Sequence, residues 1–166
     1  MTTVLFQGLP CNLYGEMPKT GFDAPSFNLT GKDLNDIKLE DYKGKKLVLN
    51  IFPSLDTPVC AASVRRFNVE ASKLENTAVL CVSMDLPFAM GRFCTTEGIE
   101  NVAVASAFRS PEFGEEYGLM IENGPLRGLL ARCVIVIDEE GKIKYVDLVD
   151  EITEEPDYEE VLKQLK

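Results

Sequence analysis

The sequence has no histidine among its 166 residues. Without histidine, a Ser-His-Asp triad, a Cys-His protease site and a His-ligated zinc site are excluded in their usual forms. Any cysteine chemistry in this chain must therefore be activated by a group other than imidazole.

Positive charge is also scarce. The chain has 17 lysines and arginines against 27 aspartates and glutamates, which gives a formal net charge of −10. Such an acidic surface argues against nucleic acid or an anionic membrane as a partner. The sequence also lacks a run of ~18 apolar residues and a charged-then-apolar leader. We therefore expect a cytoplasmic protein.

Signatures of bound cofactors are missing as well. Neither GxxxxGK[ST] nor GxGxxG occurs, and the carboxylates form no metal-binding pattern, so we expect no cofactor and no metal. The five cysteines are odd in number and form no CxxC pair, which fits neither a disulfide framework nor a zinc knuckle. They are Cys11, Cys60, Cys81, Cys94 and Cys133.

The length and the hydrophobic pattern predict one α/β domain over residues 1–166. Buried strands are expected at 46–52, 78–84 and 133–138, and helices at 58–74 and 87–97. Further short strands and helices are expected at 3–6, 12–14, 27–29, 37–39, 102–105, 111–117, 142–149 and 157–165. This order favours a thioredoxin-like three-layer sandwich, with a mixed central sheet flanked by helices and an N-terminal β-hairpin. A flavodoxin-like fold is the alternative, but it would lack the antiparallel partner at 142–149.

Cys60 is the first candidate for chemistry. Thr57 is a good N-cap and Pro58 suits the first helical position, so Cys60 falls in the first turn of a helix. The free N–H groups and the helix dipole there favour a thiolate. Alternatively, Cys60 is an inert core residue, because it shares an apolar helical stripe with Val64 and Phe67. Its place after a buried strand, where α/β sheets bind ligands, favours the chemical interpretation.

Arg132 directly precedes the apolar run of the strand expected at 133–138. A buried arginine needs an anionic partner, because an uncompensated buried charge is costly. Arg132 is therefore either a surface arginine paired with a carboxylate or a residue that faces a thiolate and a polar substrate.

Cys94 lies near the end of the second expected helix, before Thr95, Thr96 and Gly98. Such a helix end should open easily. Cys94 is either a bystander thiol or a resolving cysteine that condenses with an oxidised Cys60. Cys81 and Cys133 lie within apolar strands and are expected to serve packing, and Cys11 receives no role.

Several segments together resemble a known family. Residues 53–60 match the peroxiredoxin active-site pattern P-x-x-x-[T/S]-x-x-C, and the stretch NIFPSLDTPVCAASVRRFN at 50–68 resembles the bacterial thiol peroxidase branch, whose members are atypical 2-Cys peroxiredoxins. Further similar segments are DLPFAMGRFC at 85–94, NGPLRGLLAR at 123–132 and LVDEITEEPDYE at 148–159. The resemblance covers essentially the whole chain.

The resemblance implies a thiol-specific antioxidant peroxidase that reduces hydrogen peroxide and organic hydroperoxides to water and alcohols. It makes Cys60 the peroxidatic cysteine, which forms a sulfenic acid, and Cys94 the resolving cysteine of an intramolecular disulfide. Thr57 and Arg132 would hydrogen-bond the thiolate and the peroxide, and Pro53 would shield the pocket. The resemblance further implies thioredoxin as the reductant and a homodimer.

Two other functions fit the residues. A redox sensor or partner-binding module would use the same disulfide as a switch, and it would react slowly and show no sustained turnover. A non-catalytic α/β ligand-binding domain would be indifferent to the replacement of Cys60 by serine.

Overall fold

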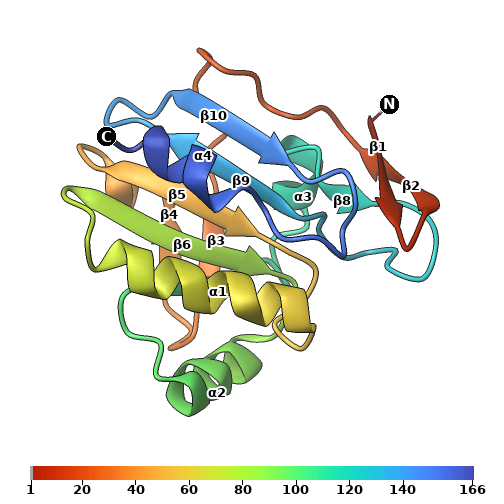
Figure 1. Cartoon of the computed structure of the whole chain (residues 1–166), viewed down its shortest axis with the longest axis horizontal. Helices are drawn as coiled ribbons and strands as arrows, with labels where there is room; N and C mark the ends of the chain where they lie inside the picture. The colour runs from red at the N-terminus through yellow and green to blue at the C-terminus, as the bar shows by residue number, and fades with distance from the viewer. Residues whose placement is uncertain (1) are drawn as a thin grey trace.

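The computed structural model describes residues 2–166 (Figure 1). In chain order its elements are β1 (Thr2–Phe6), β2 (Leu9–Tyr14), β3 (Asn28–Gly31), β4 (Asp36–Lys38), the 3-10 helix η1 (Leu39–Tyr42), β5 (Lys46–Ile51), α1 (Pro58–Ala71), β6 (Thr77–Ser83), α2 (Pro87–Glu97), β7 (Ala103–Ser106), α3 (Glu112–Glu116), β8 (Met120–Ile121), β9 (Cys133–Ile137), β10 (Ile143–Leu148) and α4 (Tyr158–Lys163).

Seven strands form the central sheet, in the order β10-β9-β5-β6-β7-β3-β4. The pairs β5–β6 and β6–β7 are parallel, whereas β9 pairs antiparallel with both β5 and β10. The mixed sheet and its final antiparallel hairpin confirm the predicted thioredoxin-like architecture. The same hairpin excludes the flavodoxin-like alternative.

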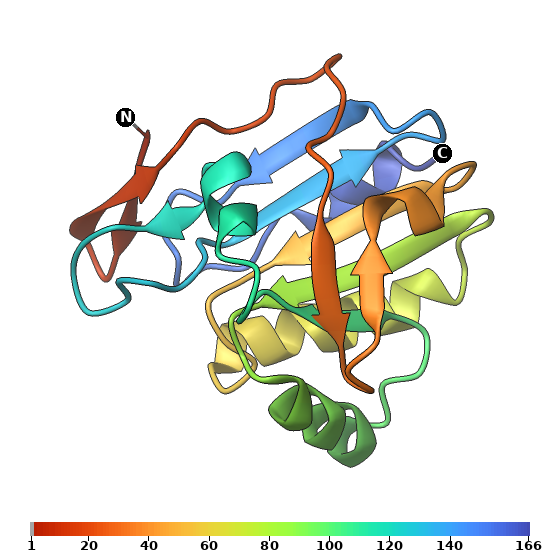
Figure 2. The same ribbon diagram turned by 180° about the vertical axis from the view of Figure 1, so that it is seen from behind.

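Alternate residues of the buried strands point to opposite faces of the sheet. In β5, Leu47, Leu49 and Ile51 join one hydrophobic cluster, and Val48 joins the other. The second cluster lies under α1, α2 and α4, which cover one face in Figure 1. The first cluster lies on the opposite face, which carries α3 and is turned toward the viewer in Figure 2. Burial on both faces explains why these strands are continuously apolar.

A separate antiparallel sheet of β1, β2 and β8 stands at one end of the molecule (Figure 2). The predicted N-terminal hairpin is therefore present, with Thr2 opposite Leu13 and Phe6 opposite Leu9. Val4 and Leu13 belong to the same hydrophobic cluster as the central sheet. That shared cluster favours the prediction of a single domain.

Several elements differ from the prediction. β2 begins at Leu9, three residues before the predicted start at 12. The strand β8 and the helix η1 were not expected, because two and four residues are too short to show a periodic pattern. The helix α1 ends at Ala71, three residues before the predicted end. Leu74 still packs beside the cluster under α1, which explains why it continues the apolar stripe beyond the helix.

Tyr117 offers a test of the packing on the α3 face. Its side chain is fully buried between Phe27 and Phe113, and its hydroxyl donates a hydrogen bond of 2.6 Å to the Pro25 carbonyl. Tyr117→Phe keeps the ring and leaves that carbonyl without this donor, so we expect the free energy of unfolding to fall by about 1–3 kcal/mol. Urea unfolding measures the change. An unchanged unfolding midpoint would contradict this role for the hydroxyl.

Candidate active site

Cys60 is the third residue of α1, as predicted. The helix begins at Pro58, and Thr57 before it has the extended backbone of an N-cap (φ −99°, ψ 143°). The loop that leads from β5 into the helix places Cys60 at the carboxyl end of a central strand. The thiol is fully buried, in the cluster under α1.

Arg132 lies against this thiol. It is only 2% exposed, so the surface-arginine alternative is wrong. Its Nη2 donates to Cys60 Sγ over 3.2 Å, and its Nε donates to the Ile152 carbonyl over 2.8 Å. Its Nη1 is buried and finds no partner within residues 2–166. A buried donor without a partner is costly, so Nη1 favours the binding of an acceptor.

Thr57 and Pro53 lie in the loop before Cys60. The Thr57 hydroxyl donates to the Ser54 carbonyl over 3.0 Å, and no side-chain capping bond accompanies its N-cap position. Among the described residues, this hydroxyl makes no hydrogen bond to Cys60. Pro53 is buried at the end of β5. The structure therefore brings both residues into the loop that precedes the thiol, and their action on a substrate stays a prediction.

A hydrogen-bonded pair that the sequence analysis missed anchors the first turn of α1 on the sheet. Ser63 Oγ donates to the Cys60 carbonyl over 2.8 Å, and Asn50 Nδ2 donates to Ser63 Oγ over 3.2 Å. Both residues are fully buried. Asn50 could have indicated this contact from the sequence, because a buried amide inside an apolar strand must find hydrogen-bond partners. In the structure its amide donates to Ser63 of α1.

Cys94 is buried in α2 and packs in the same cluster as Cys60. Neither thiol is in a disulfide. Burial raises the pKa of Cys94, and the nearby Lys32 offsets part of this rise. The two thiols therefore share one side of the sheet, as the resolving role requires.

The end of α2 is held more firmly than its sequence suggests. Asn68 Oδ1 of α1 accepts from the Asn101 N–H over 2.7 Å and from the Glu100 N–H over 3.2 Å. Arg65 forms an exposed ion pair with Glu97. Any opening of this helix end has to break these contacts, which join residues more than 30 positions apart.

The other three cysteines lie away from the Arg132 guanidinium. Cys133 follows Arg132 in sequence but belongs to the cluster on the opposite face of the sheet. Cys81 is fully buried behind α1, where burial raises its pKa to about 12. Burial also raises the pKa of Cys133. Cys11 is buried in the hairpin sheet. Their burial agrees with the expected packing role of Cys81 and Cys133.

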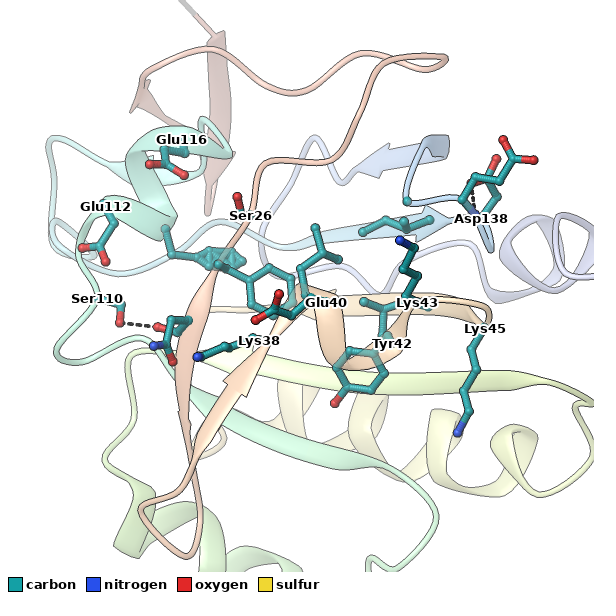
Figure 3. Close-up of a pocket in the computed structure, with 18 residues that line it drawn as sticks. Ser26, Lys38, Glu40, Tyr42, Lys43, Lys45, Ser110, Glu112, Glu116 and Asp138 are labelled. Carbon is teal, nitrogen blue, oxygen red and sulfur yellow. Dashed lines mark hydrogen bonds between the residues drawn. The ribbon is translucent and has the colours of Figure 1, made fainter.

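The structure also contains a cavity of about 620 Å³, on the face of the sheet opposite Cys60 and Cys94 (Figure 3). Its apolar walls include Phe27, Leu47, Phe113 and Ile137, which all belong to the cluster on the α3 face. Carboxylates from η1, α3 and the β9–β10 turn surround it, together with lysines from β4 and from the segment between η1 and β5 (Figure 3). Cys60 lies on the other face of the sheet, so this cavity is not part of the thiol site.

A buried thiol held by a buried guanidinium, at a helix start on a mixed sheet, defines a cysteine-dependent redox protein. A family model described as Redoxin matches residues 19–162. A thiol peroxidase of Corynebacterium glutamicum is 56% identical over 165 residues, which cover 99% of each chain.

Two further comparisons agree. A thiol peroxidase of Vibrio cholerae is 53% identical over 163 residues, covering 98% of this chain and 99% of the relative. The crystal structure of a peroxiredoxin-like protein from Aquifex aeolicus has a TM-score of 0.94 at 45% identity, covering 99% of this chain and 96% of that one. The chain belongs to the thiol peroxidases of the Redoxin family, which are peroxiredoxin enzymes. Within residues 2–166, no helix is long and apolar enough to cross a membrane.

Cys81 gives a pH-dependent prediction. The Cys81 thiol has a pKa of about 12 in the folded chain, against an ordinary thiol pKa of about 8.5. At pH values between the two, this thiol is deprotonated in the unfolded chain and protonated in the folded chain. The contribution of Cys81 to the free energy of unfolding is therefore fully present below about pH 8.5. Above that pH it falls by up to about 1.4 kcal/mol per pH unit. We expect Cys81→Ala to flatten the alkaline decline of the free energy of unfolding.

The measurement is urea unfolding under reducing conditions from pH 7 to pH 11. Val82→Ala is the matched control, because Val82 is equally buried in β6 but has no proton to lose. Equal alkaline slopes for the two variants would contradict the prediction.

Proposed function

We propose that this enzyme reduces hydrogen peroxide and organic hydroperoxides to water and alcohols, with Cys60 as the peroxidatic cysteine. The observation that carries the proposal is the contact between Arg132 Nη2 and Cys60 Sγ, beside an Nη1 that has no hydrogen-bond partner among the described residues. One amino group of the guanidinium stabilises a thiolate, and the other is free to donate to a peroxide oxygen.

In the first step the Cys60 thiolate attacks the terminal oxygen of the peroxide. A sulfur–oxygen bond forms, the O–O bond breaks, and the leaving alkoxide or hydroxide takes up a proton. Cys60 is oxidised to a sulfenic acid while the peroxide is reduced. Negative charge spreads over both oxygens as their bond lengthens, so donors aimed there stabilise the transition state more than the ground state. Arg132 Nη1 and the first-turn N–H groups of α1 are suitable donors.

Thr57 and Pro53 complete the proposed pocket. While the Thr57 hydroxyl donates to Ser54, its oxygen still has a lone pair that can accept the peroxide O–H. This contact would orient the peroxide in front of Cys60, three residues further along the chain. Pro53, buried in the same loop, has no N–H to solvate and excludes water from the thiol.

In the second step Cys94 acts as the resolving cysteine. Its thiol attacks the Cys60 sulfenic acid, the S–O bond breaks, water leaves, and a Cys60–Cys94 disulfide forms. The shared cluster of the two residues supports this pairing. A disulfide brings its two sulfurs to about 2.05 Å, and Cys60 is buried under Arg132, so the first turn of α1 or part of α2 must open.

Reduction of the disulfide closes the cycle. Two electrons and two protons are needed, and we propose thioredoxin as the dithiol that supplies them and becomes a disulfide itself. The resemblance of the whole chain to the bacterial thiol peroxidases supports this reductant. The expected cytoplasmic location rests on the odd number of cysteines and the lack of a CxxC pair, and it stays a prediction.

Peptide mapping after one equivalent of hydrogen peroxide tests the roles of the two cysteines. We expect a Cys60–Cys94 link in the wild type and no peroxide consumption by Cys60→Ser. With one equivalent, Cys94→Ser should stop at the Cys60 sulfenic acid. With excess peroxide it should consume a second equivalent and accumulate sulfinic acid at Cys60, because nothing traps the sulfenic acid. Sustained NADPH oxidation by Cys94→Ser with thioredoxin and its reductase would contradict the resolving role.

Exposed apolar residues support the proposed homodimer. Leu86 and Phe88 at the start of α2 are 52% and 69% exposed, and Phe108 is 39% exposed. Ser106 joins these segments, because its hydroxyl donates to the Asp85 carbonyl and accepts from the Phe108 N–H. Neighbouring exposed apolar side chains of this kind are typical of a protein interface.

We expect Phe88→Glu to weaken self-association, because it would bury a charge in each half of the interface. Sedimentation velocity at several concentrations measures the monomer–dimer equilibrium. Phe22→Glu is the matched control, since Phe22 is 65% exposed but lies beside the β9–β10 hairpin. A wild-type monomer, or equal effects of both variants, would contradict this interface.

A further inference from the structure

Asp85, in the turn between β6 and α2, uses both carboxylate oxygens to hold the loop before Cys60. Oδ1 accepts from Ser54 Oγ over 2.7 Å. Oδ2 accepts from the Leu55 N–H over 2.8 Å and from Ser83 Oγ over 2.6 Å. A carboxylate with three short donors is a strong and directional anchor.

The sheet fixes Asp85 from behind. Its N–H donates to Ser83 Oγ over 3.2 Å, and its carbonyl accepts from the Ser106 hydroxyl. Ser83 and Ser106 are fully buried at the ends of β6 and β7. Asp85 is therefore attached to two adjacent strands of the central sheet, which gives the anchor a rigid base.

From Asp85 the chain of contacts leads to the reactive thiol. Ser54, held by Asp85, accepts at its carbonyl from the Thr57 hydroxyl over 3.0 Å and from the Thr57 N–H over 3.2 Å. Thr57 is the N-cap of α1, three residues before Cys60. Leu55, the other loop residue held by Asp85, is buried in the cluster that contains Cys60.

We propose that Asp85 is a positioning residue for the peroxide step. It fixes residues 53–57 so that the first turn of α1 keeps Cys60 against Arg132 and leaves Thr57 in place to meet the peroxide. Asp85 itself makes no hydrogen bond to a sulfur within residues 2–166, so it acts through the loop. Disulfide formation requires the loop and the first turn of α1 to open, so the rate of that step should not depend on Asp85. This inference rests on the proposed role of Cys60.

Two substitutions of Asp85 distinguish a positioning role from an effect of its negative charge. Asp85→Ala removes all of them and releases the loop. Asp85→Asn removes the charge but keeps the shape: the amide oxygen can accept from Leu55 and Ser83, and the amide N–H₂ can donate to the Ser54 hydroxyl. A positioning role therefore predicts loss in the alanine variant and recovery of most of the rate in the asparagine variant.

Rapid-quench kinetics on the reduced full-length enzyme test the proposal. The second-order rate of Cys60 oxidation by hydrogen peroxide and the first-order rate of Cys60–Cys94 linkage are measured separately. Displacement of a reacting group by about 1 Å can cost about a hundredfold in rate, so we expect Asp85→Ala to slow oxidation at least tenfold. The linkage rate should not fall, and Asp85→Asn should recover most of the oxidation rate.

Tyr117→Phe is the matched control, because it weakens packing on the opposite face and should slow neither step. If Asp85→Ala does not fold, Ser54→Ala takes its place, since it removes one of the three donors and should slow oxidation severalfold. Wild-type oxidation rates in the folded alanine variants would overturn the inference, as would equal losses in Asp85→Ala and Asp85→Asn. Peroxide consumption that persists in Cys60→Ser would instead refute the role of Cys60.

Discussion

A guanidinium that is removed from water must find acceptors, and the Arg132 side chain finds two. One is the Ile152 carbonyl and the other is the sulfur of Cys60. The contact with sulfur places a fixed positive charge beside the proposed nucleophile, in a buried environment that screens it little. The site therefore has no need of the histidine that the sequence lacks. The remaining features of this region hold these two side chains together: Asn50 and Ser63 hold the helix turn, and Asp85 holds the loop.

The central sheet divides four of the cysteines between its two faces. Cys60, Cys81 and Cys94 lie on the face under α1 and α2, whereas Cys133 lies on the α3 face. Within the first group, only Cys60 has a guanidinium as its hydrogen-bond partner, whereas Cys81 has the neutral amide of Asn50. A sulfur without a cation in a buried site keeps its proton, as the raised pKa of Cys81 indicates. The reactivity proposed for Cys60 thus follows from its partner more than from burial, because Cys60 and Cys81 are both fully buried.

The sequence predicted the parts of the site that depend on local signals. Thr57 and Pro58 set the start of α1 and therefore the place of Cys60. The place of Arg132 before an apolar strand left two alternatives open, a surface ion pair and a buried partner, and only the folded structure decides between them. The contacts of Asn50 with Ser63 and of Asp85 with Ser54 were not predictable in this way, because they join segments whose spatial relation only the folded sheet determines. The firm attachment of the α2 end to Asn68 was missed for the same reason. The strand β8 was missed because two residues carry no periodicity.

The neighbours Arg132 and Cys133 face opposite sides of β9, so one peptide bond separates the charged side chain of the site from an inert core thiol. A shift of one residue in this strand would exchange them: the arginine would enter the apolar core and the thiol would face Cys60. Insertions and deletions just before β9 should therefore be rare in evolution. The pairing of the Ala131 N–H with the Leu119 carbonyl fixes the alignment there. Changes in chain length are better tolerated in the exposed stretch 122–125, where the turn can absorb an extra residue without moving the strand.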